Sequence, residues 1–598
     1  IMRGHPNLER RTFVDKQKLE GMIQEFSEET IQQKKVDRRA FIEGAGKIAG
    51  LSLGFVIAQS IGGLDVQAKA KTIKFSSYPF TLGVCSGDPS PQGIVLWTRL
   101  APDPLNGGGM PNEVVKVEWE LAKDENFQHI VKKGSATASP NLAHSVHVEV
   151  EGLRSNAIYY YRFKSGNELS PVGKTKTLPK KNEEVQKLTF AFASCQQYEH
   201  GYYTAYKHLA EEELDVVFHL GDYIYEYGPN EYVSASGNVR THSGPEIITL
   251  ADYRNRYAQY RSDANLKAAH AAFPWIVTWD DHEVENNYAN NIPEKGQSVQ
   301  DFIKRRAAAY QAYYEHMPLR KTSLPNGGDM SLYRDFSYGQ LASFNVLDSR
   351  QYRDDQANGD GSKPHSEESL NPNRTMLGKQ QENWLYKNLN KSKAHWNILA
   401  QQVFFAQRNF GANGTQLYSM DSWDGYPEAR NRIIDFVKKK GMNNLVVLTG
   451  DVHASWASNI NTDFNDASSS LVGVEFVGTS ITSGGNGADK RADTDRILAQ
   501  NPHIKFFNDY RGYVRCTVTP ESFQADYRVL PFVTEPNADI STRASFVYHK
   551  DQTGLKQIVT NAVPYGLKKS TEVEEDRTIA HSKAHTKQVN KLKKKVEN

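Results

Sequence analysis

Five apolar segments of this sequence each run into residues whose side chains can bind a cation or move a proton. The residues at these five ends are Cys195; Asp222 after Gly221; the run Asp280, Asp281, His282 and Glu283; Gln401 and Gln402; and Asp451 and His453 after Gly450. In layered α/β sheets, ligands bind beyond the carboxyl ends of the strands, so this repeated placement predicts one shared crevice. A single Asp at a strand end is usually a helix cap or a turn residue. Five such ends with metal-binding residue types favour a common site instead.

The donor atoms in this predicted crevice suit two different cations. The Asp222 carboxylate can bridge two ions, and the Tyr225 phenolate is a hard donor that suits Fe³⁺ better than Zn²⁺. The Cys195 thiolate is a further candidate ligand for the same iron. Two cations about 3.5–4 Å apart form a clamp for in-line displacement at phosphorus. Oxygen donors of the kind that bind Ca²⁺, Mg²⁺ or Mn²⁺ come from Asp280, Asp281, Asn287 and Asp451.

Two histidines, one arginine and one loop add further candidates for the site. His282 and His453 can ligate a metal, donate a proton or stabilise an oxyanion. Arg350 either clamps a phosphate through its bidentate guanidinium or forms a structural ion pair. Residues 420–425 predict a loop at the wall of the site, with a Trp–Asp turn as the alternative.

Several common catalytic motifs are missing from the sequence. It contains no Gly-x-x-x-x-Gly-Lys loop, no Gly-x-Ser-x-Gly and no dinucleotide-binding fingerprint. We therefore predict hydrolysis of a phosphate ester by metal-activated hydroxide. In this prediction Asp222 bridges the cations, His282 assists the leaving oxygen and Arg350 contacts the phosphate.

The elements that must position these residues form two predicted bodies. From residue 188 to 569, short apolar runs alternate with helical segments at 204–213, 253–272 and 302–316, which indicates an α/β catalytic domain. Residues 76–180 contain alternating, β-prone runs separated by glycine turns, which predicts a small all-β sandwich. The predicted fold class is therefore α/β with an N-terminal all-β domain.

The two ends of the chain lie outside these two bodies and are predicted to be a signal peptide and a basic tail. Arg38-Arg39 precedes a glycine-containing apolar stretch at 48–64, and this order predicts a twin-arginine signal peptide within residues 1–70. The stretch is short and interrupted for a stable membrane span, so the anchor alternative is disfavoured. Residues 570–598 form a basic tail that is either a solvated helix or a cover for an acidic site or an anionic cell wall.

Composition narrows the class of protein. The chain has 598 residues, of which 72 are basic and 70 acidic, giving a net charge of +2. A nucleic-acid binder would carry a strongly basic footprint, so specific nucleic-acid binding is not expected. With 38% hydrophobic and 24% charged residues, the chain can bury a large core. Three cysteines exclude a disulfide-based scaffold.

Four long motifs resemble the alkaline phosphatase D (PhoD) family of Bacillus-type bacteria, which are phosphodiesterases and phosphatases. The resemblance covers almost the whole chain and rests on residues 38–42, 194–201, 279–287 and 450–456. It implies a calcineurin-like metallophosphoesterase core, a four-layer β-sandwich flanked by helices, behind an immunoglobulin- or fibronectin-like domain. It also implies one Fe³⁺, one or two Ca²⁺, and a C-terminal segment over the site.

The resemblance also implies the protein's surroundings. The expected substrates are phosphomonoesters and phosphodiesters, including wall teichoic acids or phospholipid headgroups. The expected location is outside a bacterial cell or in its wall, after export by the twin-arginine translocase. We expect a monomer without a stable membrane span. The competing hypothesis is a wall-binding protein that keeps the fold but has lost turnover.

The wider purple acid phosphatases offer a motif-by-motif comparison. Gly221-Asp222-x-x-Tyr225 is similar to their Gly-Asp-x-x-Tyr, which implies that Asp222 bridges and Tyr225 binds iron. Cys195 stands where they have the aspartate of Asp-x-Gly, which implies an iron ligand.

The motifs for the second cation depart from that pattern. Asp281 takes the place of their asparagine ligand and His282 that of their proton donor, while Asp451 replaces the first histidine of Gly-His-x-His. These changes replace nitrogen by oxygen at the second cation and favour Ca²⁺ over Zn²⁺. Which of Asp280, Asp281, Asn287 and His453 are direct ligands stays open.

Overall fold

The five apolar segments that precede the candidate site residues are all β-strands, and they lie in two sheets. The computed structural model describes residues 73–294, 296–466, 468–550 and 554–561. The predicted signal peptide and the basic tail lie outside the described residues. Every residue of the five strands except Thr189 is buried, as expected for parallel strands covered on both faces. They are β9 (Leu188–Ala193), β10 (Val216–Leu220), β11 (Pro274–Thr278), β15 (Trp396–Ala400) and β17 (Leu445–Thr449).

Strands β9, β10 and β11 are parallel neighbours at the centre of a ten-stranded sheet. The C-terminal strands extend this sheet on one side through the antiparallel pairing of β21 with β9. These are β21 (Arg511–Val518), β22 (Ser522–Leu530), β23 (Ser541–His549) and β24 (Lys556–Thr560). N-terminal strands extend it on the other side through the parallel pairing of β1 with β11. These are β1 (Val84–Gly87), β2 (Gly93–Arg99) and β5 (Ser145–Glu151).

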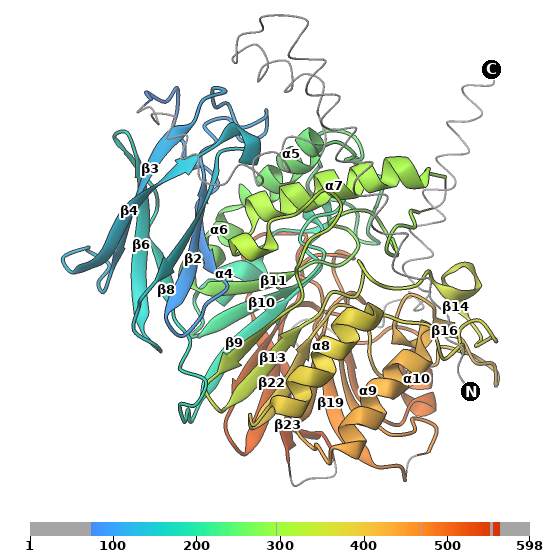
Figure 1. Ribbon diagram of the computed structural model, residues 1–598. Helices are drawn as coiled ribbons and strands as arrows, with labels where there is room; N and C mark the ends of the chain where they lie inside the picture. The colour runs from blue at the N-terminus through green and yellow to red at the C-terminus, as the bar shows by residue number, and fades with distance from the viewer. Residues whose placement is uncertain (1–72, 295, 467, 551–553, 562–598) are drawn as a thin grey trace, which may run out of the picture. The chain divides into compact units, whose positions relative to one another are not determined.

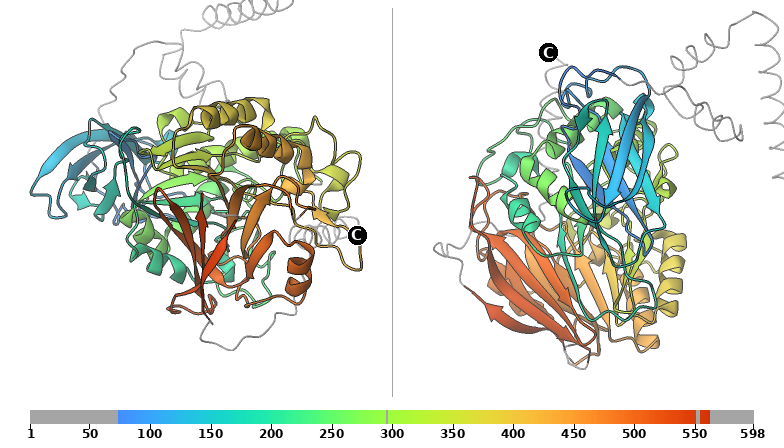
Figure 2. Two further views of the ribbon diagram at one scale, coloured as in Figure 1. Left: turned by 90° about the horizontal axis from the view of Figure 1, so that it is seen from below. Right: turned by 90° about the vertical axis from the view of Figure 1, so that its left-hand side faces the viewer.

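Strands β15 and β17 are parallel neighbours in a seven-stranded sheet. Its other members are β12 (Arg334–Tyr338), β13 (Ala342–Val346), β18 (Ser455–Asn461), β19 (Leu471–Val477) and β20 (Ile504–Asn508). Side chains from both sheets, such as Phe190, Phe218 and Phe344, form one hydrophobic cluster between them. In the right-hand view of Figure 2 the red C-terminal strands, the orange strands of the seven-stranded sheet and the yellow helix α8 (Gly378–Lys391) follow one another as layers.

Helices cover the outer faces of both sheets. The ten-stranded sheet packs against one tyrosine-rich cluster with α4 (Thr204–Ala210), α5 (Leu250–Arg261), α6 (Ala264–Ala272) and α7 (Val299–His316). The seven-stranded sheet packs against α8 (Gly378–Lys391) and α9 (Pro427–Lys439), while α10 (Thr494–Gln500) precedes β20 (Figure 1).

The sequence predicted one helix over 253–272, and this was wrong. The chain breaks at Asp263, whose carboxylate accepts hydrogen bonds from the backbone N–H groups of Asn265 and Leu266 and so caps α6.

The N-terminal all-β region is divided between two sheets. Beside β1, β2 and β5, a five-stranded sheet contains β3 (Val115–Ala122), β4 (Ile130–Ala138), β6 (Ile158–Ser165), β7 (Glu168–Leu169) and β8 (Gly173–Lys176). Apolar residues of both groups, including Ile94, Val117 and Tyr161, share one core. A two-stranded sheet of β14 (Ser362–Lys363) and β16 (Tyr418–Ser419) lies elsewhere. The mixed α/β fold predicted from the sequence is thus confirmed, but β1, β2 and β5 belong to the same sheet as the catalytic strands.

Polar contacts also join the all-β region to the catalytic part. Trp97 Nε1 on β2 donates a hydrogen bond to the carbonyl oxygen of Glu315 at 3.0 Å. The Asp88 carboxylate is buried and accepts two hydrogen bonds from the Arg334 guanidinium, at 3.0 and 2.7 Å. All described residues fall in one compact unit, residues 68–598. The two regions are therefore joined by a continuous sheet and by buried polar contacts.

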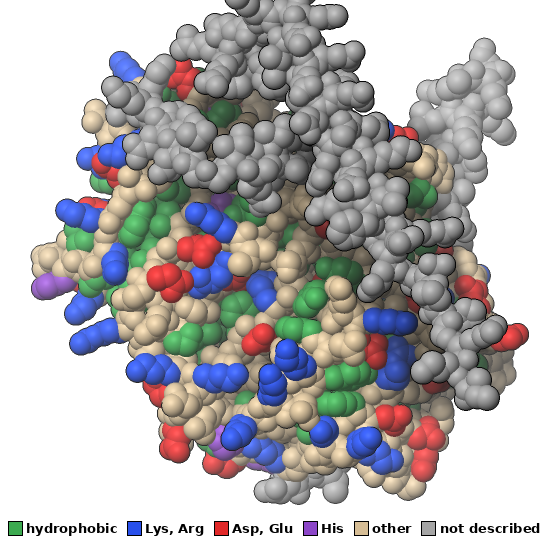
Figure 3. All heavy atoms as spheres, viewed as in Figure 1, with side chains coloured by type: hydrophobic (Ala, Val, Ile, Leu, Met, Phe, Trp, Pro, Cys, Tyr) green, Lys and Arg blue, Asp and Glu red, His purple; other side chains and the backbone are tan. Residues whose placement is uncertain are grey.

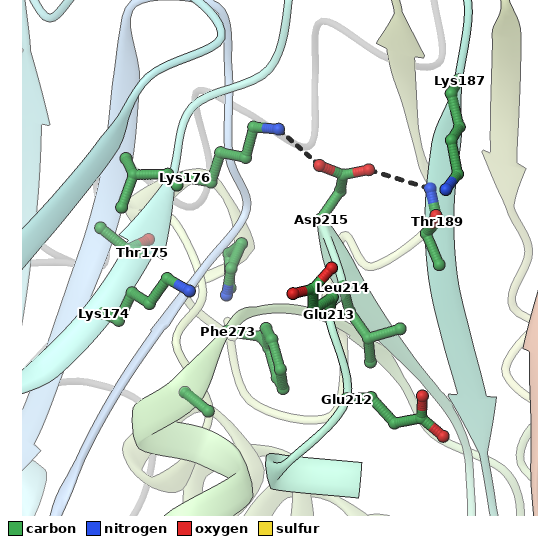
Figure 4. A pocket seen from close by; sticks show the side chains of 13 residues that line it. Lys174, Thr175, Lys176, Lys187, Thr189, Glu212, Glu213, Leu214, Asp215 and Phe273 are labelled. Carbon is green, nitrogen blue, oxygen red and sulfur yellow. Dashed lines mark hydrogen bonds and ion pairs between the residues drawn. The ribbon is translucent and has the colours of Figure 1, made fainter. Parts of the chain in front are cut away.

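A cavity of about 470 Å³ lies between the all-β region and the ten-stranded sheet (Figure 4). On its wall, Lys176 Nζ donates to Asp215 Oδ1 at 2.5 Å, and Asp215 Oδ2 accepts from the Thr189 backbone at 2.9 Å. Thr189, Asp215 and Pro274 stand at or before the amino ends of β9, β10 and β11. This cavity is therefore at the opposite end of the strands from the candidate site residues.

The surface and the helices give two further observations. On the face shown in Figure 3, Lys and Arg side chains are intermixed with Asp and Glu over the described residues. Within the same part of the chain, no helix combines the length and the apolar composition that crossing a bilayer requires.

Candidate metal centre

The turns after three of the parallel strands, β9, β10 and β17, share an uncommon backbone conformation. Cys195 after β9, Asp222 after β10, and Asp451 and His453 after β17 all have positive φ angles, between 52° and 65°. This left-handed conformation costs a non-glycine residue about 1–2 kcal/mol, and such strain concentrates at functional sites. Gly221 is also required, because its φ is 113° and a Cβ atom there would lie 2.6 Å from the Asp280 backbone nitrogen.

Two groups of side chains within the described residues bring donor atoms close enough to share a cation. In the first group, donor atoms of Cys195, Asp222 and His453 lie within 4.8 Å of one another. In the second group, donor atoms of Asp222, Asp281 and His282 do the same. All five residues are buried. Asp222 belongs to both groups, so its carboxylate stands where a ligand bridging two cations would stand.

Tyr225 lies beside the first group. Its hydroxyl donates a hydrogen bond to Asp222 Oδ2 at 2.7 Å and lies 3.1 Å from His453 Nε2. Ser483 Oγ lies 2.8 Å from the same phenol oxygen and 2.8 Å from the carbonyl oxygen of Cys195. Burial raises the pKa of the Tyr225 phenol well above its ordinary value. A phenolate at this position therefore needs a neighbouring cation.

Oxygen atoms gather on the side of the second group. The Asn287 backbone N–H donates to Asp281 Oδ2 at 2.7 Å, and Asn287 Nδ2 donates to Asp360 Oδ2 at 2.8 Å. The Oδ1 atoms of Asp281, Asn287 and Asp360 are buried and accept no hydrogen bond from any described residue, although Asp281 Oδ1 lies 3.5 Å from a terminal nitrogen of Arg350. Buried polar atoms almost always have a partner. Three such oxygens in neighbouring residues fit the coordination of a hard cation such as Ca²⁺.

The pKa values of the buried carboxylates also indicate a site for cations. Burial raises the pKa of Asp222 well above its ordinary value and that of Asp280 to about 6. Burial and the nearby Asp280 carboxylate also raise the pKa of the partly buried Asp451. Gathering anionic groups away from water is unfavourable unless positive charge compensates them. The donor set therefore fits multivalent cations, with sulfur, nitrogen and phenol on one side of Asp222 and mainly oxygen on the other.

His282 is held by a carboxylate that the sequence did not single out. His282 Nδ1 lies 2.7 Å from Glu226 Oε2, and Glu226 Oε1 accepts a hydrogen bond from the Asn286 backbone at 2.8 Å. The imidazole also stacks on the Tyr225 ring, with 4.2 Å between centroids. Burial alone lowers the pKa of His282, but Glu226 and Asp281 outweigh it and hold this pKa well above its ordinary value. This arrangement keeps a proton available at the edge of the site.

Comparison with known proteins decides the family. Residues 190–527 match the family model described as PhoD-like phosphatase, and residues 66–179 match the model described as its N-terminal domain. The chain belongs to the PhoD-like phosphatase family. It is 71% identical to alkaline phosphatase D of Bacillus subtilis (strain 168) over 576 residues, 96% of this chain and 98% of the relative. A solved structure titled "Structure of PhoD" is 73% identical, with a TM-score of 0.86 over 87% of this chain and 100% of that chain.

The family resemblance predicted from the motifs is thus confirmed, and this PhoD-like phosphatase is a hydrolase of phosphate esters. The structure brings Cys195, Asp222, Asp281, His282 and His453 into the two groups. Tyr225 and Asn287 contact members of these groups, whereas Asp280 and Asp451 belong to neither.

Glu283 connects the turns of this phosphatase. Its buried carboxylate accepts hydrogen bonds from the backbone N–H groups of Asp222 at 3.1 Å, Tyr223 at 2.6 Å and Asp280 at 2.9 Å. Burial raises the pKa of Glu283 to about 8, and the three backbone hydrogen bonds oppose this shift. Glu283 therefore fixes the turn after β10 to the turn after β11, and with it the distance between the candidate ligands.

Arg350 is surrounded by carboxylates. Its Nε donates to Asp280 Oδ1 at 2.5 Å, its two terminal nitrogens lie 2.7 and 2.8 Å from the two Asp421 oxygens, and one lies 3.5 Å from Asp281 Oδ1. Its side chain is fully buried. Of the two roles considered for Arg350, this pattern is the one expected of a structural ion pair. Asp421, from the loop predicted at the site wall, does reach the site through this contact.

Three residues of this site were missed by sequence reasoning, and their signals differ. Glu226 directly follows Tyr225, so proximity to a motif could have indicated it. Asp360 and Ser483 lie in glycine-flanked loops far from any motif. Only the folded chain brings these two beside Asn287 and Tyr225.

Proposed function

We propose that this phosphatase is an exported, metal-dependent phosphoesterase that hydrolyses both phosphomonoesters and phosphodiesters at a mixed iron–calcium centre. The observation that carries the proposal is the position of Asp222, which belongs to both candidate ligand groups. A shared carboxylate is the feature expected of two cations that act on one phosphate.

The donor chemistry supports a particular assignment. Cys195, Asp222, Tyr225 and His453 would hold Fe³⁺, because phenolate and thiolate are anionic donors that stabilise the ferric state. Asp222, Asp281 and Asn287 would hold Ca²⁺, with Asp280 and Asp451 as further oxygens from the same edge and Asp360 available beside Asn287. When bound, the two cations would supply Lewis acidity at the phosphate and at the attacking water.

The protein's own residues supply orientation and a proton. His282, held through Nδ1 by Glu226, presents Nε2 as the donor to the leaving oxygen. Glu283 keeps the turns carrying Asp222 and Asp280 at a fixed separation. Water is restricted because these side chains are almost fully buried. Each of these effects stabilises the transition state, in which negative charge develops on the leaving oxygen.

Other parts of the proposal rest on the sequence and the family. We expect export through Arg38 and Arg39, an N-terminal domain of immunoglobulin or fibronectin type, and a basic tail at 570–598 that limits access. Diesters such as wall teichoic acids or phospholipid headgroups are proposed substrates beside monoesters. The match to a curated alkaline phosphatase D supports an exported bacterial enzyme.

Metal analysis and chelation test the proposal. The purified enzyme should contain about one iron per chain, and a calcium-selective chelator should abolish turnover of both a monoester and a diester. Calcium should restore turnover and zinc should not. Bound cations stabilise the folded state, so chelation should also lower the melting temperature. Full activity in excess chelator, or rescue by zinc alone, would show that the second cation is not calcium. An iron-free inactive protein would instead favour the wall-binding alternative.

A further inference from the structure

The guanidinium of Arg350 has its donors directed at carboxylates rather than into open space. Three carboxylates, those of Asp280, Asp281 and Asp421, lie within 3.5 Å of its nitrogens. The Arg350 and Asp421 side chains are 0% and 2% exposed. A phosphate that took the place of Asp421 would leave a buried carboxylate without its partner, which is strongly unfavourable.

Asp421 is itself fixed by three donor side chains, those of Arg350, Arg353 and Gln356. Besides both terminal nitrogens of Arg350, its Oδ1 accepts from Arg353 at 2.6 Å and from Gln356 Nε2 at 2.6 Å. Gln356 Nε2 also donates to the carbonyl oxygen of Asn287 at 2.8 Å. Asp421 therefore stands between the arginine pair and the segment that carries Asn287.

Arg350 in turn reaches the calcium side of the candidate centre. Asp281 is a member of the second ligand group, and Asp280 directly precedes it after β11. Arg350 contacts both carboxylates, and its backbone carbonyl accepts from the Asn290 N–H at 3.0 Å. Asp421 is therefore connected through Arg350 to the candidate calcium ligands Asp280 and Asp281.

We propose that Arg350 and Asp421 are positioning residues, which hold Asp280 and Asp281 in place for the cation, and that Arg350 does not bind the substrate phosphate. This inference rests on the proposed calcium site. Partners of ligands that do not touch the metal commonly change metal affinity or activity by 10- to 100-fold when replaced. Asp421, which does not belong to either ligand group, should therefore control calcium affinity.

The test compares Asp421→Asn with Asp424→Asn in the full-length enzyme. Asp424 is a matched control, because it is buried, lies in the same loop and binds Arg430 at 2.6 Å without contacting Arg350. Calcium binding is followed by calorimetry and by the rise in melting temperature, and inhibition by inorganic phosphate is measured at saturating calcium. Asp421→Asn should weaken calcium binding at least tenfold, leave the phosphate inhibition constant unchanged, and differ from Asp424→Asn in calcium binding alone.

Arg350→Lys provides a second variant if Asp421→Asn does not fold, because lysine keeps the charge but cannot pair bidentately. It too should weaken calcium binding without changing phosphate inhibition at saturating calcium. The proposal is overturned if either folded variant binds calcium like the wild type, or if Arg350→Lys raises the phosphate inhibition constant tenfold at saturating calcium. A wild type that binds no calcium would refute the proposed function instead, so the two failures are distinguishable.

Discussion

Replacing Glu226 by glutamine isolates the contribution of one buried carboxylate to proton transfer. Glutamine has the same shape, but its amide has one acceptor where glutamate has two. Glu226 accepts from Asn286 and pairs with His282 Nδ1 at 2.7 Å. The amide that keeps the Asn286 bond must turn its NH₂ group toward His282. That contact is acceptable only if Nδ1 carries no proton, so protonated His282 is destabilised.

The expected size follows from the interaction that is lost. A hydrogen bond to a charged group contributes about 1.5–3 kcal/mol, which corresponds to roughly 10- to 150-fold in an equilibrium or rate constant. The loss should fall on proton donation to the leaving oxygen. Glu226→Gln should therefore lower kcat by this factor for alkyl phosphates, whose leaving groups need a proton, and by much less for nitrophenyl phosphate.

The same change has a predictable pH dependence. Glu226 helps to hold the pKa of His282 above its ordinary value, so removing its charge lowers that pKa. Activity that requires protonated His282 is lost as pH rises through the pKa. The alkaline limb of the pH profile should therefore move to lower pH in Glu226→Gln.

The assay is a series of aryl and alkyl monoesters whose leaving groups span a range of acidity. A plot of log kcat against leaving-group pKa should be steeper for Glu226→Gln than for the wild type. Glu475→Gln is the control, because Glu475 is a buried carboxylate that accepts from the Phe405 and Ala406 backbone and has no contact with His282. An equal loss for all substrates, or an unchanged alkaline limb, would refute the role given to Glu226.

Four further predictions concern iron, calcium, export and access. Tyr225→Phe should remove or shift a visible charge-transfer band while the far-ultraviolet circular dichroism stays unchanged; a colourless wild type would contradict the iron assignment. Asp451→His should move the metal preference from calcium toward zinc, as measured by reactivation of the metal-free enzyme, and an unchanged preference would remove Asp451 from the ligand set. Replacing Arg38 and Arg39 by lysine should retain the protein in the cytoplasm, and normal secretion would contradict a twin-arginine signal. Truncation after Lys569 should raise kcat/KM, most of all for bulky diesters, and equal rates for large and small substrates would leave the tail without this role.

Much of the site could be predicted from the sequence because its residues stand at strand ends. The apolar runs before Cys195, Asp222 and Asp451 are all strands, as the pattern indicated. Parallel strands carry their carboxyl ends to one edge of a sheet, which accounts for the closeness of Cys195 and Asp222 after β9 and β10. His453 follows β17 in the other sheet, and it joins them because the two sheets pack against each other. The positive φ angles at these positions were not predicted, because even Asp and His, which adopt this conformation more often than most residues, do so only at a small fraction of positions.

The parts that sequence reasoning missed depend on contacts between distant segments. Ser483 reaches Tyr225 across 258 residues and Asp360 reaches Asn287 across 73, with no periodicity or motif to join them. The division into two bodies at about residue 180 followed the change in local sequence pattern. Local pattern could not reveal that Ser86 and Gly87 pair with Pro274 and Trp275 in one sheet.

The ten-stranded sheet has a consequence for the order of events during synthesis. Its central strand β9 pairs with β21, so Phe192 lies opposite Val514. The backbone hydrogen bonds on this edge of β9 cannot form until β21, near the end of the chain, has left the ribosome. Contacts between residues so far apart form slowly, and unpaired edges are prone to aggregate in the interval. The catalytic sheet therefore cannot be finished segment by segment during translation. A cell that exports this enzyme must either hold the completed chain until it has folded or protect an open sheet on the far side of the membrane.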